Sequence, residues 1–122
     1  MKKFISVPVR LGGNGSSPTE GYVEAFDITN GQWGGICENQ FDLYDAHVIC
    51  KMLGFPTATE ALVNGTAADL YGTAPSGSNF TIDNLDCKGS ESSVFHCSLT
   101  GELTDLCEAS QIAGVKCATS KI

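Results

Sequence analysis

Six cysteines in a chain of 122 residues limit the possible folds more than any other feature of the sequence. They are Cys37, Cys50, Cys87, Cys97, Cys107 and Cys117. No two are close enough to form a C-x-x-C pair, on which zinc ribbons and thioredoxin-like redox sites depend, so both kinds of site are disfavoured. An even number of separated cysteines instead predicts disulfides, which form in an oxidising, extracellular setting. Spacing alone does not choose among the pairings, and six reduced cysteines in a cytosolic protein are the alternative.

The length and the charge of the chain exclude several classes of protein. The length allows one domain with a hydrophobic core of its own. Acidic side chains outnumber basic ones by 14 to 7, and the formal net charge is −7. This balance disfavours binding to nucleic acid and a polybasic membrane-surface role, because both need clustered cations. No apolar run approaches the length of a membrane span, so we expect no direct insertion into a membrane.

Three N-x-[ST] triplets favour an extracellular location, because this triplet accepts N-linked glycans. They begin at Asn14, Asn64 and Asn79. The start of the chain disagrees, since residues 1–8 lack the apolar region of a secretory signal peptide. We interpret Met1 and its neighbours as a start added for expression before an excised or mature domain. The alternative is a genuine cytosolic initiator.

Strands are predicted in the first third of the chain. Alternating apolar residues over Phe4–Leu11 predict a strand, which a proline within it confines to a sheet edge. Leu11–Glu20 is rich in glycine and serine and predicts a loop. Tyr22–Asp27 alternates again, and Asn30-Gly31 follows with the residue pair that tolerates a type I′ turn. We therefore expect a hairpin whose second strand covers residues 32–37.

One helix is predicted over about residues 43–53, with Asp42 as its cap. Asp45 lies in the first turn, where the helix dipole favours an anion. Gly54 and Pro56 follow the last turn and end the helix. Apolar side chains recur at the spacing of one buried helical face, at Ala46, Ile49, Cys50 and Leu53.

The rest of the chain predicts shorter elements. Residues 57–68 are ambiguous between a short helix and an irregular crossing, and residues 70–79 predict a loop. Phe80–Leu85 and Gly114–Cys117 predict strands. The expected fold class is therefore α+β, in a single domain.

Catalytic motifs are absent from the sequence, which lacks G-x-S-x-G and H-E-x-x-H. We expect structural roles for His47 and His96, and we expect Asp83 and Asp86 to be solvated turn residues. The glycine-rich segment Leu11–Gly15 is not followed by a capped helix that could bind phosphate. The basic residues are scattered along the chain. We therefore do not expect an enzyme.

Several segments resemble the scavenger receptor cysteine-rich (SRCR) domain, in the order and spacing of that family. They are VRLGG (Val9–Gly13), GYVEAF (Gly21–Phe26), NGQWGGIC (Asn30–Cys37), FDLYDAHVICKMLGFP (Phe41–Pro56), DNLDCKGSESSVFHC (Asp83–Cys97) and AGVKC (Ala113–Cys117). The cysteine count resembles the six-cysteine, group A-like type. The resemblance implies one SRCR domain over residues 9–118, after the added start and a leading strand (residues 1–8) and before a tail (residues 119–122).

The fold implied by the resemblance is a curved, mainly antiparallel sheet that cradles one helix and is stapled by disulfides. The implied pairs are Cys37–Cys107, Cys50–Cys117 and Cys87–Cys97. Two positions depart from the family pattern, because Gly35 stands where threonine is usual and Thr81 stands where tryptophan often occurs. Each departure predicts looser local packing.

The family's calcium motif is degenerate in this sequence. The family typically has two aspartates after the first of these cysteines and a glutamate four residues past the fifth, and the residues here are Glu38, Asn39 and Gln111. Ile112 also replaces an acidic residue. Calcium binds six to eight oxygen ligands and favours carboxylates, so the lost charge predicts weak binding or a polar surface loop without metal. No cofactor is expected to be required.

The function implied by the resemblance is non-catalytic ligand recognition of the scavenger or innate-immune type, with at most weak calcium dependence. The domain would be secreted or part of a receptor ectodomain and would bind a protein, glycan or microbial surface. The charge of −7 favours a neutral or basic ligand over a polyanion. One alternative is a metal-independent adhesion or allorecognition domain that binds one protein partner. Another is an accessory domain excised from a larger secreted enzyme.

Overall fold

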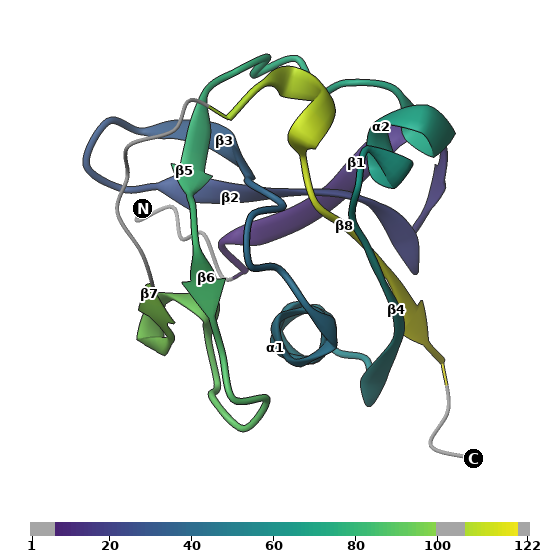
Figure 1. Cartoon of the computed structure of the whole chain (residues 1–122). Coiled ribbons are helices and arrows are strands. Elements are labelled where there is room, and N and C mark those ends of the chain that lie inside the picture. The colour runs from purple at the N-terminus through teal and green to yellow at the C-terminus, as the bar shows by residue number, and fades with distance from the viewer. Residues whose placement is uncertain (1–6, 100–106, 120–122) are drawn as a thin grey trace, which may run out of the picture.

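A curved sheet that wraps around one helix dominates the structure, a computed structural model that describes residues 7–99 and 107–119 (Figure 1). Within these residues the sheet has six strands in the order β4-β8-β2-β3-β5, and β1 pairs with β2. All its pairs are antiparallel except β3 with β5. The strands are β1 (Val9–Ser17), β2 (Glu20–Asp27), β3 (Gln32–Ile36), β4 (Thr57–Leu62), β5 (Phe80–Ile82) and β8 (Gly114–Ala118).

The remaining elements are short, apart from the main helix. A second, two-stranded sheet is formed by β6 and β7. These elements are α1 (Leu43–Met52), α2 (Thr66–Tyr71), β6 (Leu85–Asp86), β7 (Ser98–Leu99) and the 3₁₀ helices η1 (Val94–His96) and η2 (Ala109–Gln111). Neither described α-helix is long and apolar enough to cross a membrane. The α+β class and the curved, mainly antiparallel sheet with one main helix are thus confirmed.

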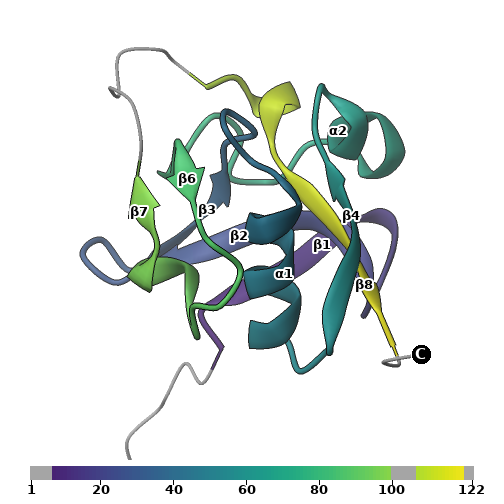
Figure 2. The ribbon, with the colours of Figure 1, turned by 60° about the horizontal axis from the view of Figure 1, so that its bottom comes forward.

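Helix α1 begins and ends where the sequence predicts. The Asp42 side chain accepts hydrogen bonds from the backbone N–H groups of Tyr44 and Asp45, and the Asp45 carboxylate accepts one from the Asp42 N–H, at 2.8 Å. This reciprocal capping box satisfies N–H groups that have no partner inside the helix. Gly54 follows the C-cap with a φ of 95°, which ends the helix. Figure 2 shows α1 lying along the concave side of the sheet.

Strand β1 corrects the prediction of a loop over Leu11–Glu20. It continues to Ser17, and only Pro18 and Thr19 separate it from β2. The pairing of β1 with β2 shifts register between Gly12 and Ser17. Gly13 lies inside that irregular stretch with a φ of 113°, a backbone conformation that residues other than glycine rarely adopt. Pairing with the neighbouring strand β2 has here overridden a local composition that is typical of loops.

The β2–β3 hairpin is confirmed, but the predicted type I′ turn is wrong. Strand pairing ends at Asp27 opposite Gln32, so the connection is a four-residue loop rather than a two-residue turn. The Asp27 carboxylate accepts a hydrogen bond from the Thr29 backbone N–H at 2.9 Å, and within the loop only Gly31 has a positive φ. An aspartate that bonds two residues ahead initiates its own turn, which displaces the tight one.

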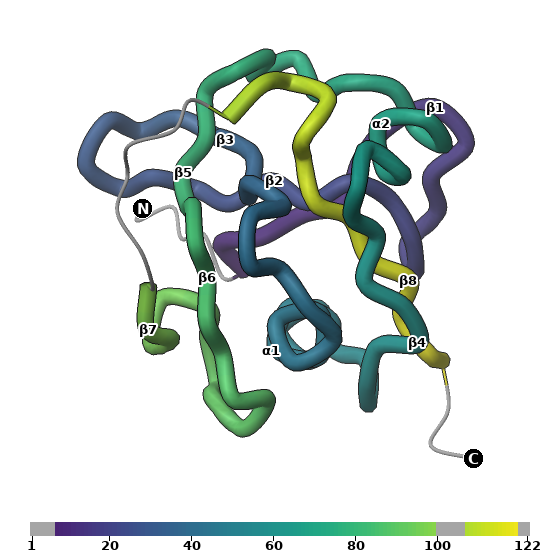
Figure 3. The backbone as a smooth tube through the Cα atoms, in the orientation of Figure 1, coloured from purple at the N-terminus to yellow at the C-terminus, as the bar shows by residue number. Residues whose placement is uncertain are grey.

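Both faces of the sheet are covered near its centre. The main core, between the sheet and α1, includes Val9, Val23, Ala25, Ile36, Ala46, Val48, Ile49, Cys50, Leu85 and Val115. A second cluster on the other face contains Tyr22, Leu62, Ala67, Tyr71, Ala74 and Ile112. Residues 57–68, predicted as a short helix or an irregular crossing, instead form strand β4 of the sheet and the start of α2. They contribute Leu62 and Ala67 to this cluster. Figure 3 follows the irregular segment from α2 to β5 across one end of the sheet.

Three disulfides join the elements of the fold. Cys37 bonds to Cys107, Cys50 to Cys117 and Cys87 to Cys97, with Cα–Cα distances of 6.1, 5.5 and 4.8 Å. No cysteine is free. These are the pairs that the resemblance implies. The second of them connects α1 to β8, and thus ties the helix to the sheet that surrounds it.

Candidate functional site

The predicted cation residues lie beside the Cys37–Cys107 disulfide. The Glu38 backbone N–H donates a hydrogen bond to the Gln111 carbonyl oxygen at 2.8 Å. Cys37 forms an isolated β-bridge with Ile112, which aligns the two segments. The structure therefore brings the Glu38–Asn39 segment next to Gln111, as the predicted site requires.

The Glu38 and Gln111 side chains of this cluster already accept hydrogen bonds from the backbone. Glu38 Oε1 accepts a bond from the Gly65 backbone N–H at 2.9 Å, and Gln111 Oε1 accepts one from the Glu108 N–H at 2.8 Å. Ile112 is buried with 1% of its surface exposed, so it belongs to the core rather than to a ligand shell. One carboxylate, engaged with the backbone, and two amides fit calcium poorly.

Another cluster of ligating atoms lies elsewhere and is also unsuited to a metal. Across residues 7–99 and 107–119, Cys87, Glu91 and Cys97 form the one group of three such side chains with all ligand atoms within 4.8 Å. The two cysteines are joined by a disulfide. The Glu91 carboxylate accepts hydrogen bonds from the backbone N–H groups of Lys88 and Gly89, which lower its pKa and organise the loop.

Three basic side chains of the described residues have partners within the domain. Arg10 Nε donates to Glu24 Oε1 at 3.0 Å, and the guanidinium lies 4.1 Å from the centre of the Trp33 ring. Lys51 Nζ donates to the Gly89 carbonyl oxygen at 2.7 Å. Each of these cations is therefore held by a partner within the domain. The Lys116 ammonium lies 3.9 Å from the carboxylate of Glu60.

The histidines have local structural contacts. His47 Nδ1 accepts a hydrogen bond from the Ala58 backbone N–H at 3.0 Å, which joins α1 to β4. His96 Nδ1 lies 3.3 Å from the Ser92 hydroxyl oxygen. Asp83 accepts a hydrogen bond from the adjacent backbone N–H and is half-buried, whereas Asp86 is exposed.

All three predicted glycosylation asparagines are exposed. Asn14 lies in the irregular part of β1 and Asn64 in the connection between β4 and α2. Asn79 immediately precedes β5, and its carbonyl oxygen accepts a hydrogen bond from the Gly35 N–H. Glycosylation at these positions stays a prediction.

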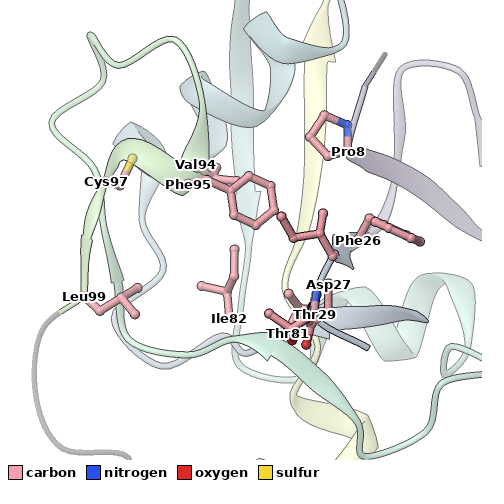
Figure 4. Close-up of a pocket in the computed structure, with 11 residues that line it drawn as sticks. Pro8, Phe26, Asp27, Thr29, Thr81, Ile82, Val94, Phe95, Cys97 and Leu99 are labelled. Atoms are coloured by element: carbon pink, nitrogen blue, oxygen red, sulfur yellow. Dashed lines mark hydrogen bonds between the residues drawn. The ribbon is translucent and has the colours of Figure 1, made fainter. Parts of the chain in front are cut away.

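An apolar groove, which the sequence did not predict, lies between the tip of the β2–β3 hairpin and the segment from η1 to β7 (Figure 4). Its volume is about 580 Å³. Its apolar lining includes Phe26, Ile28, Ile82, Val94, Phe95 and Leu99. Sequence reasoning missed it because these residues come from separate segments that only the fold brings together. The local signal was Ile28, an apolar residue in an otherwise polar turn.

A curved sheet around one helix, stapled by three disulfides, defines the class of SRCR-like extracellular domains. The family model described as "Scavenger receptor cysteine-rich domain" matches residues 13–118, so the chain belongs to this family. Domains of this family are extracellular, and the disulfides agree with that location.

Two solved structures share the fold. The third SRCR domain of murine neurotrypsin superposes with a TM-score of 0.75 and 32% sequence identity, over 90% of this chain and 94% of that chain. The SRCR domain of mouse MARCO, solved in a dimeric form, superposes with a TM-score of 0.65 and 33% identity, over 81% of this chain and 86% of that chain.

Two curated relatives are much longer than this chain. Galectin-3-binding protein of Rattus norvegicus is 41% identical over 105 residues, which cover 86% of this chain and 17% of that protein. Lysyl oxidase homolog 2 of Xenopus laevis is 33% identical over 116 residues, which cover 95% of this chain and 14% of that protein. The chain thus spans less than a fifth of either relative.

Proposed function

We propose that this chain is an extracellular, non-catalytic ligand-recognition domain of the scavenger or innate-immune type. It binds a protein or a glycan, including one on a microbial surface. Membership of the SRCR family supports this proposal. So does the similarity to galectin-3-binding protein, whose name describes a binding protein.

The ligand in this proposal is neutral or basic. The observation that carries this preference is the engagement of Arg10 and Lys51 in contacts within the domain. A polyanion is captured by clustered, available cations, and the net charge of −7 opposes its approach. A neutral surface or a basic protein meets no such opposition.

Calcium dependence is weak at most in this proposal. The Glu38 carboxylate and the Gln111 amide oxygen both accept backbone hydrogen bonds that hold loops together. The same observation favours the alternative of a metal-independent adhesion or allorecognition domain with one protein partner. The similarity to lysyl oxidase homolog 2 favours a further alternative, an accessory domain of a larger secreted enzyme.

The ligand class can be tested with the disulfide-intact domain immobilised on a biosensor. The analytes are panels of extracellular proteins and glycans, together with dextran sulfate and uncharged dextran at physiological salt. We expect a neutral or basic analyte to bind and the signal to be lost after reduction and alkylation. Dextran sulfate should bind no better than dextran. Preferential binding of dextran sulfate, or binding that survives reduction, would contradict the proposal.

A further inference from the structure

Exposed apolar side chains gather at the apolar groove. Ile28, Phe95 and Leu99 line it, and 83%, 46% and 57% of their respective surfaces are exposed. Single exposed apolar residues are ordinary on a protein surface, whereas a contiguous group around a concavity is typical of a binding site. Figure 4 shows the Phe95 ring directed across the groove towards the hairpin that carries Phe26.

A single charge lies among the residues that line the groove. Asp27 is acidic, and among the described residues that line the groove none is basic. The hydroxyl and backbone N–H groups of Thr29 donate hydrogen bonds to Asp27 Oδ1, at 2.6 and 2.9 Å. These bonds lower the pKa of Asp27, so the carboxylate stays ionised at physiological pH. The groove therefore offers an apolar surface with one fixed negative charge at its edge.

A polar pocket of about 340 Å³ adjoins the apolar groove. The two share Asp27 and Thr81 as common lining residues. Amide and hydroxyl groups of Asn30, Gln32, Ser78 and Asn79 line the polar pocket, together with Trp33, Gly34 and Phe80. Amide and carboxylate oxygens accept hydrogen bonds, and a guanidinium or ammonium group donates several.

We propose that the apolar groove holds an apolar side chain of a partner protein while the adjoining polar pocket holds a basic side chain next to it in that protein's sequence. This inference rests on the proposed function and names the partner class and the face that binds it. Charge complementarity selects this occupant, because Asp27 is the charged residue of the groove. A second copy of this chain is disfavoured, since it would bring two Asp27 carboxylates and two charges of −7 together.

The direct test is a titration of the ¹⁵N-labelled chain with short peptides, followed by NMR. The first peptide is acetyl-Ser-Leu-Phe-Arg-Ser-amide; a second replaces Arg by Glu, and a third replaces Leu and Phe by Ser. We expect the first peptide to shift amide signals of residues 26–32 and 94–99. The other two should bind at least several-fold more weakly, since one lacks the charge and the other lacks the apolar contact.

Three variants locate the binding. Ile28→Ser combined with Phe95→Ser removes exposed apolar surface and should lower the affinity for the Arg peptide by about tenfold or more. Asp27→Asn keeps an oxygen that can accept the Thr29 bonds but removes the charge. The affinity of this variant for the Arg peptide should be about threefold lower and should equal its affinity for the Glu peptide. Leu70→Ser, at a half-exposed position on α2, is the matched control and should change nothing. Melting temperatures of all variants verify the fold.

A control chain that begins at Val7 tests for self-occupancy, because Lys2, Lys3, Phe4 and Ile5 share the chemistry of the probe. Binding that emerges only in the shortened chain would assign the groove to that segment and overturn the proposal. Concentration-dependent shifts without peptide would assign it to a second copy, with the same consequence. A third outcome is that no peptide binds, while the biosensor detects a ligand whose binding is unchanged in the Ile28 and Phe95 variant. This outcome would overturn the inference and leave the proposed function intact.

Discussion

Asp45 is a buried carboxylate that connects two parts of the fold. It accepts the Asp42 N–H at the start of α1, at 2.8 Å, and the Cys87 N–H after β6, at 2.7 Å. None of its surface is exposed. Burial raises the pKa of Asp45 to about 7, although the two backbone hydrogen bonds act in the opposite direction. The sequence indicated its capping position but not its contact with Cys87, which depends on the fold.

The raised pKa of Asp45 predicts a pH-dependent stability. The folded state holds the proton more tightly than the unfolded chain, so this contribution is full below about pH 4 and is lost as the pH rises through about 7. The reference is Asp45→Asn, which does not titrate. The difference in unfolding free energy between wild type and Asp45→Asn should fall by about 2–4 kcal/mol between pH 4 and pH 8. Urea denaturation at several pH values measures it, and a difference that grows with pH would contradict the prediction.

Glu38 is expected to act as a structural acceptor rather than as a metal ligand. Glu38→Ala removes the acceptor of the Gly65 N–H and should lower stability by about 1 kcal/mol, or several degrees in Tm. The decrease should be equal in calcium and in a chelator. Thermal melts measure it, with the exposed Glu60→Ala as control. The opposite outcome would be a Tm of the wild type that millimolar calcium raises by several degrees and a Tm of Glu38→Ala that calcium does not change. That outcome would show a metal at Glu38.

At the scale of elements, Gly35 on β3 corrects the expectation of looser packing. A Cβ atom at Gly35 would lie 2.9 Å from both the Phe80 ring and the end of the Ile112 side chain. The space is therefore filled by neighbours. Thr81 likewise has a role of its own, since its hydroxyl donates to the Ala25 carbonyl oxygen at 2.9 Å and links β5 to β2.

The occupied space predicts that Gly35→Thr, which restores the residue usual in the family, destabilises this chain. Overpacking of a core position costs about 1–3 kcal/mol. Phe80→Ala alone should also destabilise, but the double variant should be more stable than the sum of the two losses implies, because the smaller side chain makes room. Chemical denaturation of the four proteins gives the coupling energy. Strict additivity would contradict the proposed steric conflict.

The elements differ in how far the sequence predicted them. Some depend on residues of one segment alone, and others depend on pairing with a second segment. Helix α1 was predictable because its cap, apolar face and terminating glycine all lie within one segment. Strand β1 was not, because its register depends on β2 and its glycines suggested a loop. The candidate site divides in the same way. The degenerate motif around Glu38 was visible in the sequence, whereas the apolar groove depends on residues from separate segments.

At the scale of the molecule, the three disulfides close loops of very different length. Cys50 and Cys117 are 67 residues apart, and Cys87 and Cys97 are 10 apart. In the chain-entropy model the longer loop contributes about 4 kcal/mol and the shorter about 3 kcal/mol. Both Cys50 and Cys117 belong to the main core, whereas of the other pair only Cys87 does and Cys97 packs against it, so losing the long-range bond removes more packing.

Replacing Cys50 and Cys117 together by alanine should therefore destabilise the domain more than replacing Cys87 and Cys97. We expect the second variant to keep a cooperative unfolding transition and the first to lose most of its stability. Denaturation followed by circular dichroism measures both, and free-thiol assays verify the remaining bonds. Equal losses, or a larger loss for the short loop, would contradict the ranking.

The Cys37–Cys107 bond also determines how the domain would respond to mechanical load. A force applied at the two ends of the chain passes along the shortest covalent path, which crosses from Cys37 to Cys107 through the sulfur atoms. The intervening stretch, with a separation of 70 residues, is therefore shielded from extension, and about 240 Å of contour length stays locked. Strands β1 to β3, which precede Cys37, and β8, which follows Cys107, lie on the loaded path. Under tension these strands would bear the load, while α1 and the segment that carries Phe95 stay within the covalent loop.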